Sequence, residues 1–334
     1  MTTLRINFAC WEYDRTEALR SGRILPDGID LNYITLPVQE TFFRMLKYRE
    51  FDASEMSLAS YVLSLENEDR PFVAIPVFPS RLFRHSAIYV NVNSRIEEPQ
   101  DLIGKKVGTP EWQLTATVWV RGILADYYGV PLASATYFTG GEETPGRKEK
   151  QPIANLPKEV VIIDIGRDKT LAKMLDDGEI DALYTPRTPS VFSRGSKNVK
   201  RLFPNFRQEE EKYYRDTRIF PIMHTIVLRR DIYEENPWIA QSLFKAFLQA
   251  QKIAYNNVIE SGKEGALKVM IPWLGTYADE IVSLMGNDYW AYGVNSNRGV
   301  LNTFLKYCKE QGLSKDLRKP EELFASETQE AYII

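Results

Sequence analysis

The sequence has little histidine and cysteine, no long apolar run and no large excess of charge. Its 334 residues include two histidines and two cysteines, and the formal net charge is −3. Cys10 and Cys308 are too few for a disulfide framework, so we expect either one long-range disulfide or, as we favour, two buried thiols. The small charge gives no reason to expect nucleic acid as a partner.

Membrane association is not expected either. No segment is apolar over the length needed to cross a bilayer, and the N-terminus soon reaches charged residues, unlike a signal peptide. The hydrophobic fraction is 44% and the charged fraction 26%, which is ordinary for a globular protein with an ample core. We therefore expect a soluble, cytoplasmic protein with no membrane partner.

Both histidines stand in the same local setting. His85 opens the apolar run that ends at Asn91, and His224 opens a similar run that ends at Arg229. Short β-branched and apolar runs of this kind predict strands. The pattern therefore predicts two strands side by side, with two imidazoles at the mouth of one cleft.

The rest of the chain predicts an α/β protein. Apolar runs alternate with segments of helical spacing, which is typical of parallel sheets. A new strand–helix series starts at Lys105. Residues 139–158 are polar and rich in Gly and Pro, so we interpret them as a long surface loop or lid. Residues 204–218 are predicted to be irregular, and the chain after about residue 237 is predicted to be mostly helical.

This layout predicts two lobes joined by two crossing hinge strands. The first lobe comprises residues 1–89 and 226–334, and the second comprises residues 90–225. In such folds ligands bind in the cleft, at the carboxyl ends of strands and the amino ends of helices.

Several local motifs, spread nearly from end to end, carry a resemblance. They are Tyr13-Asp14-Arg15-Thr16, Phe42-Phe43-Arg44-Met45, Phe51-Asp52-Ala53-Ser54-Glu55-Met56-Ser57, Phe83-Arg84-His85-Ser86, Gly108-Thr109-Pro110-Glu111, Trp119-Val120-Arg121-Gly122, Tyr184-Thr185-Pro186-Arg187 and Tyr292-Gly293-Val294-Asn295. The layout resembles a type II periplasmic-binding-protein-like fold, and the motifs resemble the 4,5-dihydroxyphthalate decarboxylase family. The resemblance implies a non-oxidative decarboxylase of 4,5-dihydroxyphthalate or a related hydroxybenzoate-type acid.

Such a reaction needs two proton transfers and no organic cofactor. A base takes the proton of a hydroxyl para to the carboxylate, and an acid protonates the ring carbon that carries the carboxylate. Histidine is the natural proton carrier near neutral pH, so His85 and His224 are the first candidates. Glu111 is our candidate for the acid, with Glu55 and Asp14 as alternatives.

Binding of an anionic aromatic ligand calls for cations, hydroxyls and flat apolar side chains. Arginine grips carboxylates with two parallel hydrogen bonds, helix starts attract anions, and aromatic rings stack on aromatic ligands. Each candidate also has a purely structural alternative as a salt bridge, a helix cap or a core side chain. The predicted substrate-binding residues are Arg15, Ser57, Arg81, Arg84, Trp112, Thr115, Tyr184 and Arg187, and Trp11 is a further candidate for the ring.

Some alternatives stay open on the sequence. The two histidines could hold a divalent metal together with Glu111 or Glu12, although no local spacing supports a metal site. The expected partner is a small aromatic carboxylate, and a homo-oligomer is open. The main alternative function is a solute-binding protein for an aromatic carboxylate without catalysis. A third function, an enzyme of pyrimidine or cofactor-precursor synthesis on the same fold, is favoured by no local feature.

Overall fold

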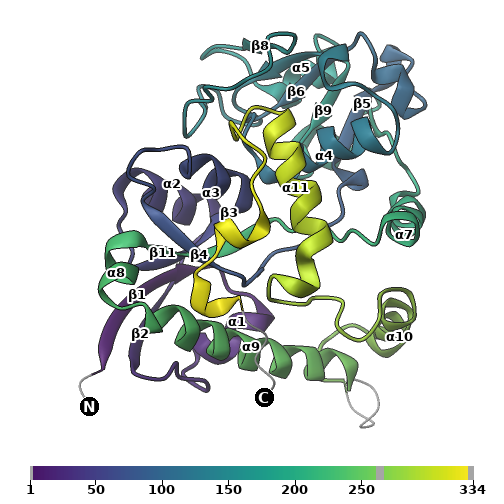
Figure 1. Cartoon of the computed structure of the whole chain (residues 1–334). Helices are drawn as coiled ribbons and strands as arrows, with labels where there is room; N and C mark the ends of the chain where they lie inside the picture. The colour runs from purple at the N-terminus through teal and green to yellow at the C-terminus, as the bar shows by residue number, and fades with distance from the viewer. Residues whose placement is uncertain (1–2, 261–266, 330–334) are drawn as a thin grey trace.

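The computed structural model describes residues 3–260 and 267–329 and contains two β-sheets, one in each lobe (Figure 1). The first sheet has the order β2-β1-β3-β11-β4. Its parallel strands pair β1 with β2 and with β3, whereas β11 runs antiparallel between β3 and β4. The strands are β1 (Leu4–Cys10), β2 (Ile29–Thr35), β3 (Ala53–Ser57), β4 (Phe72–Ile75) and β11 (His224–Arg229).

The second sheet has the order β10-β5-β9-β6-β7-β8. Strands β9, β6, β7 and β8 are parallel, and β5 runs antiparallel between β9 and β10. Its strands are β5 (Ile88–Asn91), β6 (Lys106–Thr109), β7 (Thr136–Thr139), β8 (Val161–Asp164), β9 (Ala182–Tyr184) and β10 (Val199–Arg201). Each sheet thus contains one central antiparallel strand, β11 in the first sheet and β5 in the second. The predicted α/β fold is confirmed.

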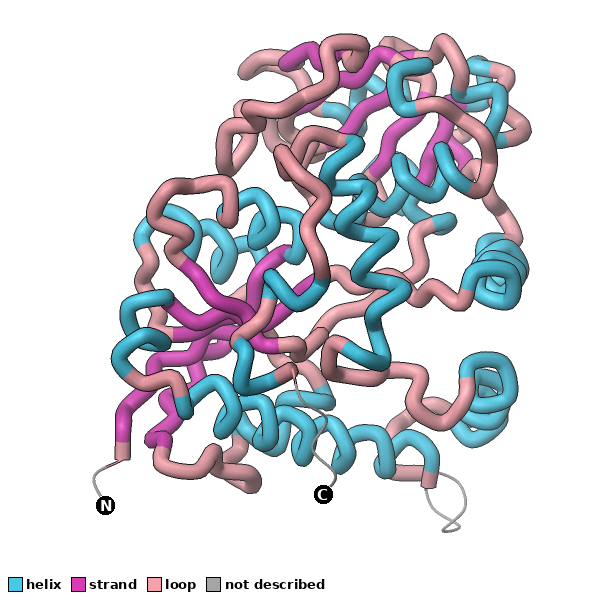
Figure 2. The backbone as a smooth tube through the Cα atoms, in the orientation of Figure 1, coloured by secondary structure: helices cyan, strands magenta, loops and turns pink. Residues whose placement is uncertain are grey.

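Helices cover the sheets (Figure 2). The long α9 lies under the first sheet, and α11 runs alongside both lobes (Figure 1). The α-helices are α1 (Asp14–Arg20), α2 (Val38–Tyr48), α3 (Leu58–Ser64), α4 (Thr115–Asp126), α5 (Leu171–Asp177), α6 (Ser190–Ser193), α7 (Phe206–Thr217), α8 (Arg230–Glu235), α9 (Trp238–Ile259), α10 (Leu274–Met285) and α11 (Arg298–Glu310). No helix among the described residues has the length and apolarity that a membrane crossing requires.

The two crossing segments lie side by side between the sheets. Arg81 and Ile222 form an antiparallel bridge, the Met223 N–H donates to the Ser80 carbonyl at 2.8 Å, and the Leu82 N–H donates to the Pro221 carbonyl at 3.2 Å. Beyond this contact the chains diverge, because β5 enters the second sheet and β11 the first. The crossings are therefore adjacent, but the strands that follow the two histidines are not. The lobe boundaries stay a prediction.

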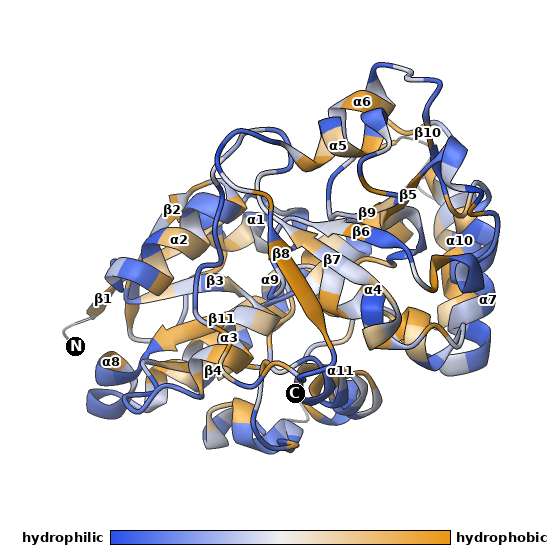
Figure 3. Ribbon diagram, turned by 90° about the horizontal axis from the view of Figure 1, so that it is seen from above, coloured by the Kyte–Doolittle hydropathy of each residue, from blue (hydrophilic) through white to orange (hydrophobic). Residues whose placement is uncertain are grey.

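The prediction that residues 204–218 are irregular was wrong, because α7 occupies Phe206–Thr217. This helix is strongly polar and is drawn mostly in the hydrophilic colour (Figure 3). Of its residues only Tyr213 and Tyr214 are buried, so its sequence lacks the broad apolar stripe by which surface helices are recognised. Tyr213 packs instead against aromatic side chains of the second lobe.

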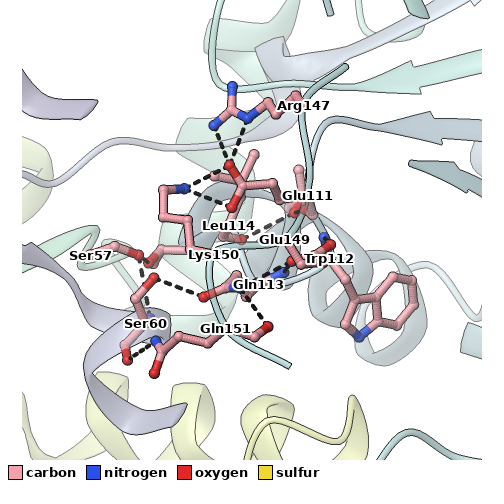
Figure 4. A network of polar contacts seen from close by, with 12 residues as sticks. Ser57, Ser60, Glu111, Trp112, Gln113, Leu114, Arg147, Glu149, Lys150 and Gln151 are labelled. Carbon is pink, nitrogen blue, oxygen red and sulfur yellow. Dashed lines mark hydrogen bonds and ion pairs between the residues drawn. The ribbon is translucent and has the colours of Figure 1, made fainter. Parts of the chain in front are cut away.

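The long loop predicted over 139–158 is confirmed, since no helix or strand lies between β7 and β8. Gly141 permits its tight start, because a Cβ atom at this position would lie 1.7 Å from the Thr144 carbonyl oxygen. The loop folds inward over the junction of the two lobes and supplies charged side chains there (Figure 4).

Candidate active site

A cavity of about 400 Å³ lies between the two sheets. It is reached from the carboxyl ends of β1, β3 and β9 and from the start of β11, the position at which ligands bind in α/β folds. Its walls combine apolar, hydroxyl and cationic side chains. The lining residues are Trp11, Pro37, Val38, Gln39, Phe42, Ser57, Arg84, Leu114, Thr115, Ala116, Lys150, Pro186, Arg187, Met223 and His224.

His224 is held at the cavity wall by a buried carboxylate. Its Nδ1 lies 2.6 Å from Glu55 Oε1, and its ring meets the Phe42 ring edge-on at a centroid distance of 4.9 Å. His224 and Ser57 are cross-strand partners in β11 and β3, which fixes both side chains at the same edge of the sheet. With Glu55 ionised, Nδ1 carries the hydrogen and Nε2 is left as the basic nitrogen.

Glu55 is fully buried and is held by several donors. The Tyr13 hydroxyl donates to Oε1 at 2.6 Å, and the Trp11 N–H donates to Oε2 at 3.3 Å. Burial alone would raise the pKa of Glu55, but the charge and hydrogen bond of His224, with the Tyr13 and Trp11 bonds, outweigh burial and lower it. The carboxylate is therefore ionised at neutral pH and can accept the hydrogen bond of His224 Nδ1.

Arg84 places a buried cation in the cavity. Arg84 is 7% exposed, and its Nε donates to the Met223 sulfur at 3.1 Å. Burial lowers the pKa of the guanidinium to about 10, so the group stays charged at neutral pH. Within residues 3–260 and 267–329 no carboxylate forms an ion pair with it. A buried cation without a carboxylate partner suits an anionic ligand.

Arg187 supplies a second cation from the loop after β9. It is exposed, it lines the cavity, and it makes no ion pair in the part of the chain that the structure describes. Its backbone N–H donates to Thr185 Oγ1 at 3.2 Å, which fixes the loop rather than the side chain. The guanidinium is therefore available at the rim.

Hydroxyl and amide groups join the two lobes beside the cavity. Ser57 Oγ lies 2.8 Å from Thr115 Oγ1, and Thr115 Oγ1 also accepts the Ala59 N–H at 3.0 Å. Gln151 of the long loop donates to the Ser60 carbonyl at 3.0 Å (Figure 4). Ser57 and Thr115 thus lie at the cavity as predicted, but they bond to each other and to the start of α3.

Glu111 lies behind the cavity in an ion cluster. Its residue is 1% exposed, Lys150 Nζ lies 2.6 Å from both of its carboxylate oxygens, and Arg147 Nε donates to Oε1 at 2.6 Å (Figure 4). Both carboxylate oxygens of Glu111 are thus engaged by cations of the loop. Lys150, rather than Glu111, lines the cavity.

His85 lies away from the cavity, in an aromatic pocket of the second lobe. It is 2% exposed, and its ring is 5.8 Å from Tyr128, 5.2 Å from Phe203 and 5.3 Å from Tyr213, measured between centroids. Neither ring nitrogen has a partner among the described residues, and burial lowers the pKa of His85 to about 4. The two imidazoles therefore do not share one cleft.

Arg15 and Arg81 also lie outside the cavity lining. The Arg15 guanidinium donates to the Pro79 carbonyl and lies over the rings of Tyr13 and Trp290, at 4.2 Å and 4.5 Å from their centroids. Arg81 donates to the Phe220 carbonyl at 3.2 Å and to the Ala291 carbonyl at 2.7 Å. Both arginines tie the crossing segments to their surroundings.

Trp112 and Tyr184 are core side chains. Trp112 is fully buried, its Nε1 donates to the Gln311 carbonyl at 2.8 Å, and the Arg121 guanidinium lies 3.7 Å above its ring. Tyr184 is 1% exposed in β9. Trp11 and Phe42 supply the aromatic faces of the cavity instead.

Sequence reasoning therefore located part of the cavity and missed part of it. His224, Ser57, Arg84, Thr115 and Arg187 line it, as does the further candidate Trp11, whereas the other predicted site residues do not. Lys150 and Phe42 were missed as site residues. The only local signal for Lys150 was the cluster of basic residues inside a loop rich in Gly and Pro.

The metal site considered from the sequence is not formed by the residues proposed for it, because His85, His224 and Glu111 occupy three different environments. Across the described ranges, no group of three His, Cys, Asp or Glu side chains is arranged to hold a metal ion. Cys10 and Cys308 are both buried free thiols, as favoured from the sequence.

Comparison with known proteins finds close relatives. A 4,5-dihydroxyphthalate decarboxylase of Comamonas testosteroni is 37% identical over 334 residues, the full length of both chains. A protein of Pseudomonas putida with the same name is 38% identical over 215 residues, which are 64% of this chain and 83% of that protein. No family model matches the chain.

Solved structures with the same fold are more distant. A periplasmic sulfonate-binding protein of Methylobacillus flagellatus matches with a TM-score of 0.54 and 14% identity, covering 97% of this chain and 92% of that one. The aliphatic sulphonate-binding protein of Escherichia coli matches with a TM-score of 0.53 and 13% identity, covering 97% and 98%. These likenesses show the type II periplasmic-binding-protein-like fold.

Proposed function

Because the chain belongs to the 4,5-dihydroxyphthalate decarboxylase family, we propose that it removes carbon dioxide, without oxidation, from a hydroxylated aromatic acid held between its lobes. The name of both relatives makes 4,5-dihydroxyphthalate the first substrate to test. The observation that carries the proposal is the His224–Glu55 pair at a cavity that also contains the buried cation of Arg84, which forms no ion pair among the residues that the structure describes.

The cavity suits a small aromatic dianion. Its volume of about 400 Å³ lies within the range of small-molecule sites, and Trp11 and Phe42 offer faces to a ring. Arg84 and Arg187 come from different segments, so they can engage two carboxylates of one ligand. Binding to both lobes at once also favours the closed arrangement, since an open form would lose one set of contacts.

His224 is the proposed base. Its Nε2 takes the proton of the hydroxyl para to the departing carboxylate, and electron density moves from the phenolate oxygen into the ring. The ring carbon that carries the carboxylate then receives a proton from a second group. Its bond to the carboxylate breaks, carbon dioxide leaves, the bonding pair returns to the ring, and His224 gives its proton back to the oxygen. The net reaction consumes one proton per carbon dioxide released.

Glu55 is the proposed positioning residue for His224. Its carboxylate accepts the Nδ1 hydrogen, which directs Nε2 as the proton acceptor, and its charge stabilises the imidazolium that forms. Tyr13, which donates to the same carboxylate oxygen, holds Glu55 in place. This arrangement gives the base a fixed direction and a fixed tautomer.

Carbon dioxide release by the purified protein tests the proposal. Acids with a hydroxyl para to a carboxylate, 4,5-dihydroxyphthalate first, should release carbon dioxide, whereas phthalate, which lacks hydroxyls, should bind without reacting. His224→Gln should lose most of the activity, and His85→Phe is the matched control, because its ring lies outside the cavity. Binding of every acid without release from any would instead support the solute-binding alternative, which the relatives do not favour.

Location and assembly remain part of the proposal. Two buried free thiols fit a reducing compartment such as the cytoplasm.

A homo-oligomer would cover the apolar side chains exposed around α10, among which Trp273 is 68% exposed and Tyr277 is 43% exposed. Light scattering after size exclusion tests assembly, and a monomer at micromolar concentration would refute it.

A further inference from the structure

We infer that Lys150 is the acid that protonates the ring carbon as the carboxylate departs, and that Glu111 and Arg147 position it. This inference rests on the proposed function, which requires a second proton carrier besides His224. Besides His224, Lys150 is the side chain among the described residues of the cavity lining that can both carry a proton at neutral pH and release it, because arginine does not deprotonate in this range.

Lys150 and His224 belong to different lobes. His224 stands on the first sheet at the start of β11, whereas Lys150 lies in the long loop between β7 and β8 of the second sheet. Both line the same cavity. A ring bound between them can therefore meet a base at its hydroxyl and an acid at the carbon para to it, which is the arrangement that the reaction needs.

The neighbouring Gln151 fixes this part of the loop. Its side chain donates to the Ser60 carbonyl of the first lobe at 3.0 Å, and its own carbonyl accepts from Gln113 Nε2 at 3.1 Å. Ser60 Oγ in turn donates to Gln113 Oε1 at 3.3 Å (Figure 4). The acid is therefore brought to the cavity by contacts between the lobes, so docking of the loop assembles the site.

The charges around Lys150 allow it to lose a proton. Glu111 is one buried anion that is paired with two cations, Arg147 and Lys150. When Lys150 gives up its proton, Glu111 keeps Arg147 as its partner and no unpaired buried carboxylate is left. Burial lowers the pKa of Lys150, although the charge of Glu111 opposes this, and Glu149 is a further carboxylate facing the cluster.

The step balances as follows. The ammonium of Lys150 gives one proton to the ring carbon, and the bond from that carbon to the carboxylate breaks. Carbon dioxide leaves, the electron pair stays with the ring, and the neutral amine of Lys150 regains a proton from water. Neither an oxidant nor a reductant is needed.

Substitution of Lys150 by arginine separates proton donation from charge. Lys150→Arg keeps a cation beside Glu111 but removes the acid, so kcat should fall by about 10²–10⁴-fold with little change in KM. Lys150→Met removes both charge and proton, so kcat should fall equally and KM should rise. Lys148→Met is the matched control: it removes an exposed lysine of the same loop that does not line the cavity, and should keep kcat close to the wild-type value.

Chemical rescue gives a second readout. In Lys150→Ala, added small primary amines should restore part of kcat, and the restored rate should depend on the pKa of the amine. A Lys150→Arg variant with wild-type kcat would overturn the inference, and so would Lys150→Ala that stays folded and active without amine. Wild-type protein that releases no carbon dioxide from any hydroxylated acid would instead overturn the proposed function.

Discussion

Replacement of His85 by phenylalanine should make the protein more resistant to acid. The neutral imidazole sits among Tyr128, Phe203 and Tyr213 with no partner for either nitrogen in the described chain, and burial lowers its pKa to about 4. An unfolded chain exposes the same imidazole to water, where its pKa is about 6.5. Protons therefore bind to the unfolded state first, and acid draws the protein toward unfolding.

The size of this effect follows from the two pKa values. Because the folded value is the lower one, the stability due to neutral His85 is complete above about pH 6.5 and is lost as the pH falls toward 4. Linkage gives a loss of about 2 kcal/mol at pH 5 and about 3 kcal/mol at pH 4. Phenylalanine does not titrate, so His85→Phe should escape this loss.

Urea unfolding of both proteins at pH 7.5 and pH 5 measures the difference. All other titratable groups are the same in both proteins, so their contributions cancel in the comparison. The gain of His85→Phe over wild type should be larger at pH 5 than at pH 7.5 by about 2 kcal/mol. The same stability difference between His85→Phe and wild type at both pH values would refute the reasoning. It would show that His85 takes up protons equally in the folded and unfolded states.

Other substitutions test the cavity. His224→Gln should lower kcat by about 10²–10⁴-fold, and Glu55→Gln should lower kcat while leaving KM nearly unchanged; equal turnover in all three proteins would exclude this pair from proton transfer. Arg84→Ala should weaken ligand binding by about 10–150-fold in calorimetry, with partial recovery in Arg84→Lys. Arg187→Ala should have a smaller effect, since its exposed charge is screened by water; a larger effect than that of Arg84→Ala would contradict this order. Gly141→Ala should displace the long loop, because the added Cβ would meet the Thr144 carbonyl. It should therefore reduce kcat while changing the melting temperature little.

Local sequence pattern was enough to predict the elements of the sheets. The apolar run at Ile226–Leu228 predicts a buried strand, and these residues lie unexposed between β3 and β4. The Gly- and Pro-rich composition of residues 139–158 likewise predicts a loop. Such features depend on neighbours within a few residues, so they are readable along the chain. The polar helix α7 was not predicted, because its two buried residues, Tyr213 and Tyr214, give no clear helical periodicity.

The same local pattern could not separate the two histidines. His224 opens β11 as predicted, but His85 lies in a 3-10 helix, His85–Ala87, that precedes β5, so the strand predicted from His85 begins only at Ile88. His224 meets Glu55 across 169 positions of sequence, whereas His85 meets the rings of Tyr128 and Tyr213. Which imidazole faces the cavity depends on the sheet that its strand enters, and strand order is decided by long-range pairing.

Lys150 is a second residue whose environment the local sequence could not predict. Composition predicts that it lies in a loop, but its direction is set by Glu111, 39 residues earlier, and by the contact of Gln151 with Ser60 of the other lobe. The sequence by itself determined the α/β class, most of the strands and the supply of cations. The tertiary structure alone decided which charges are buried together, because a buried charge is stable only beside partners that distant segments bring to it.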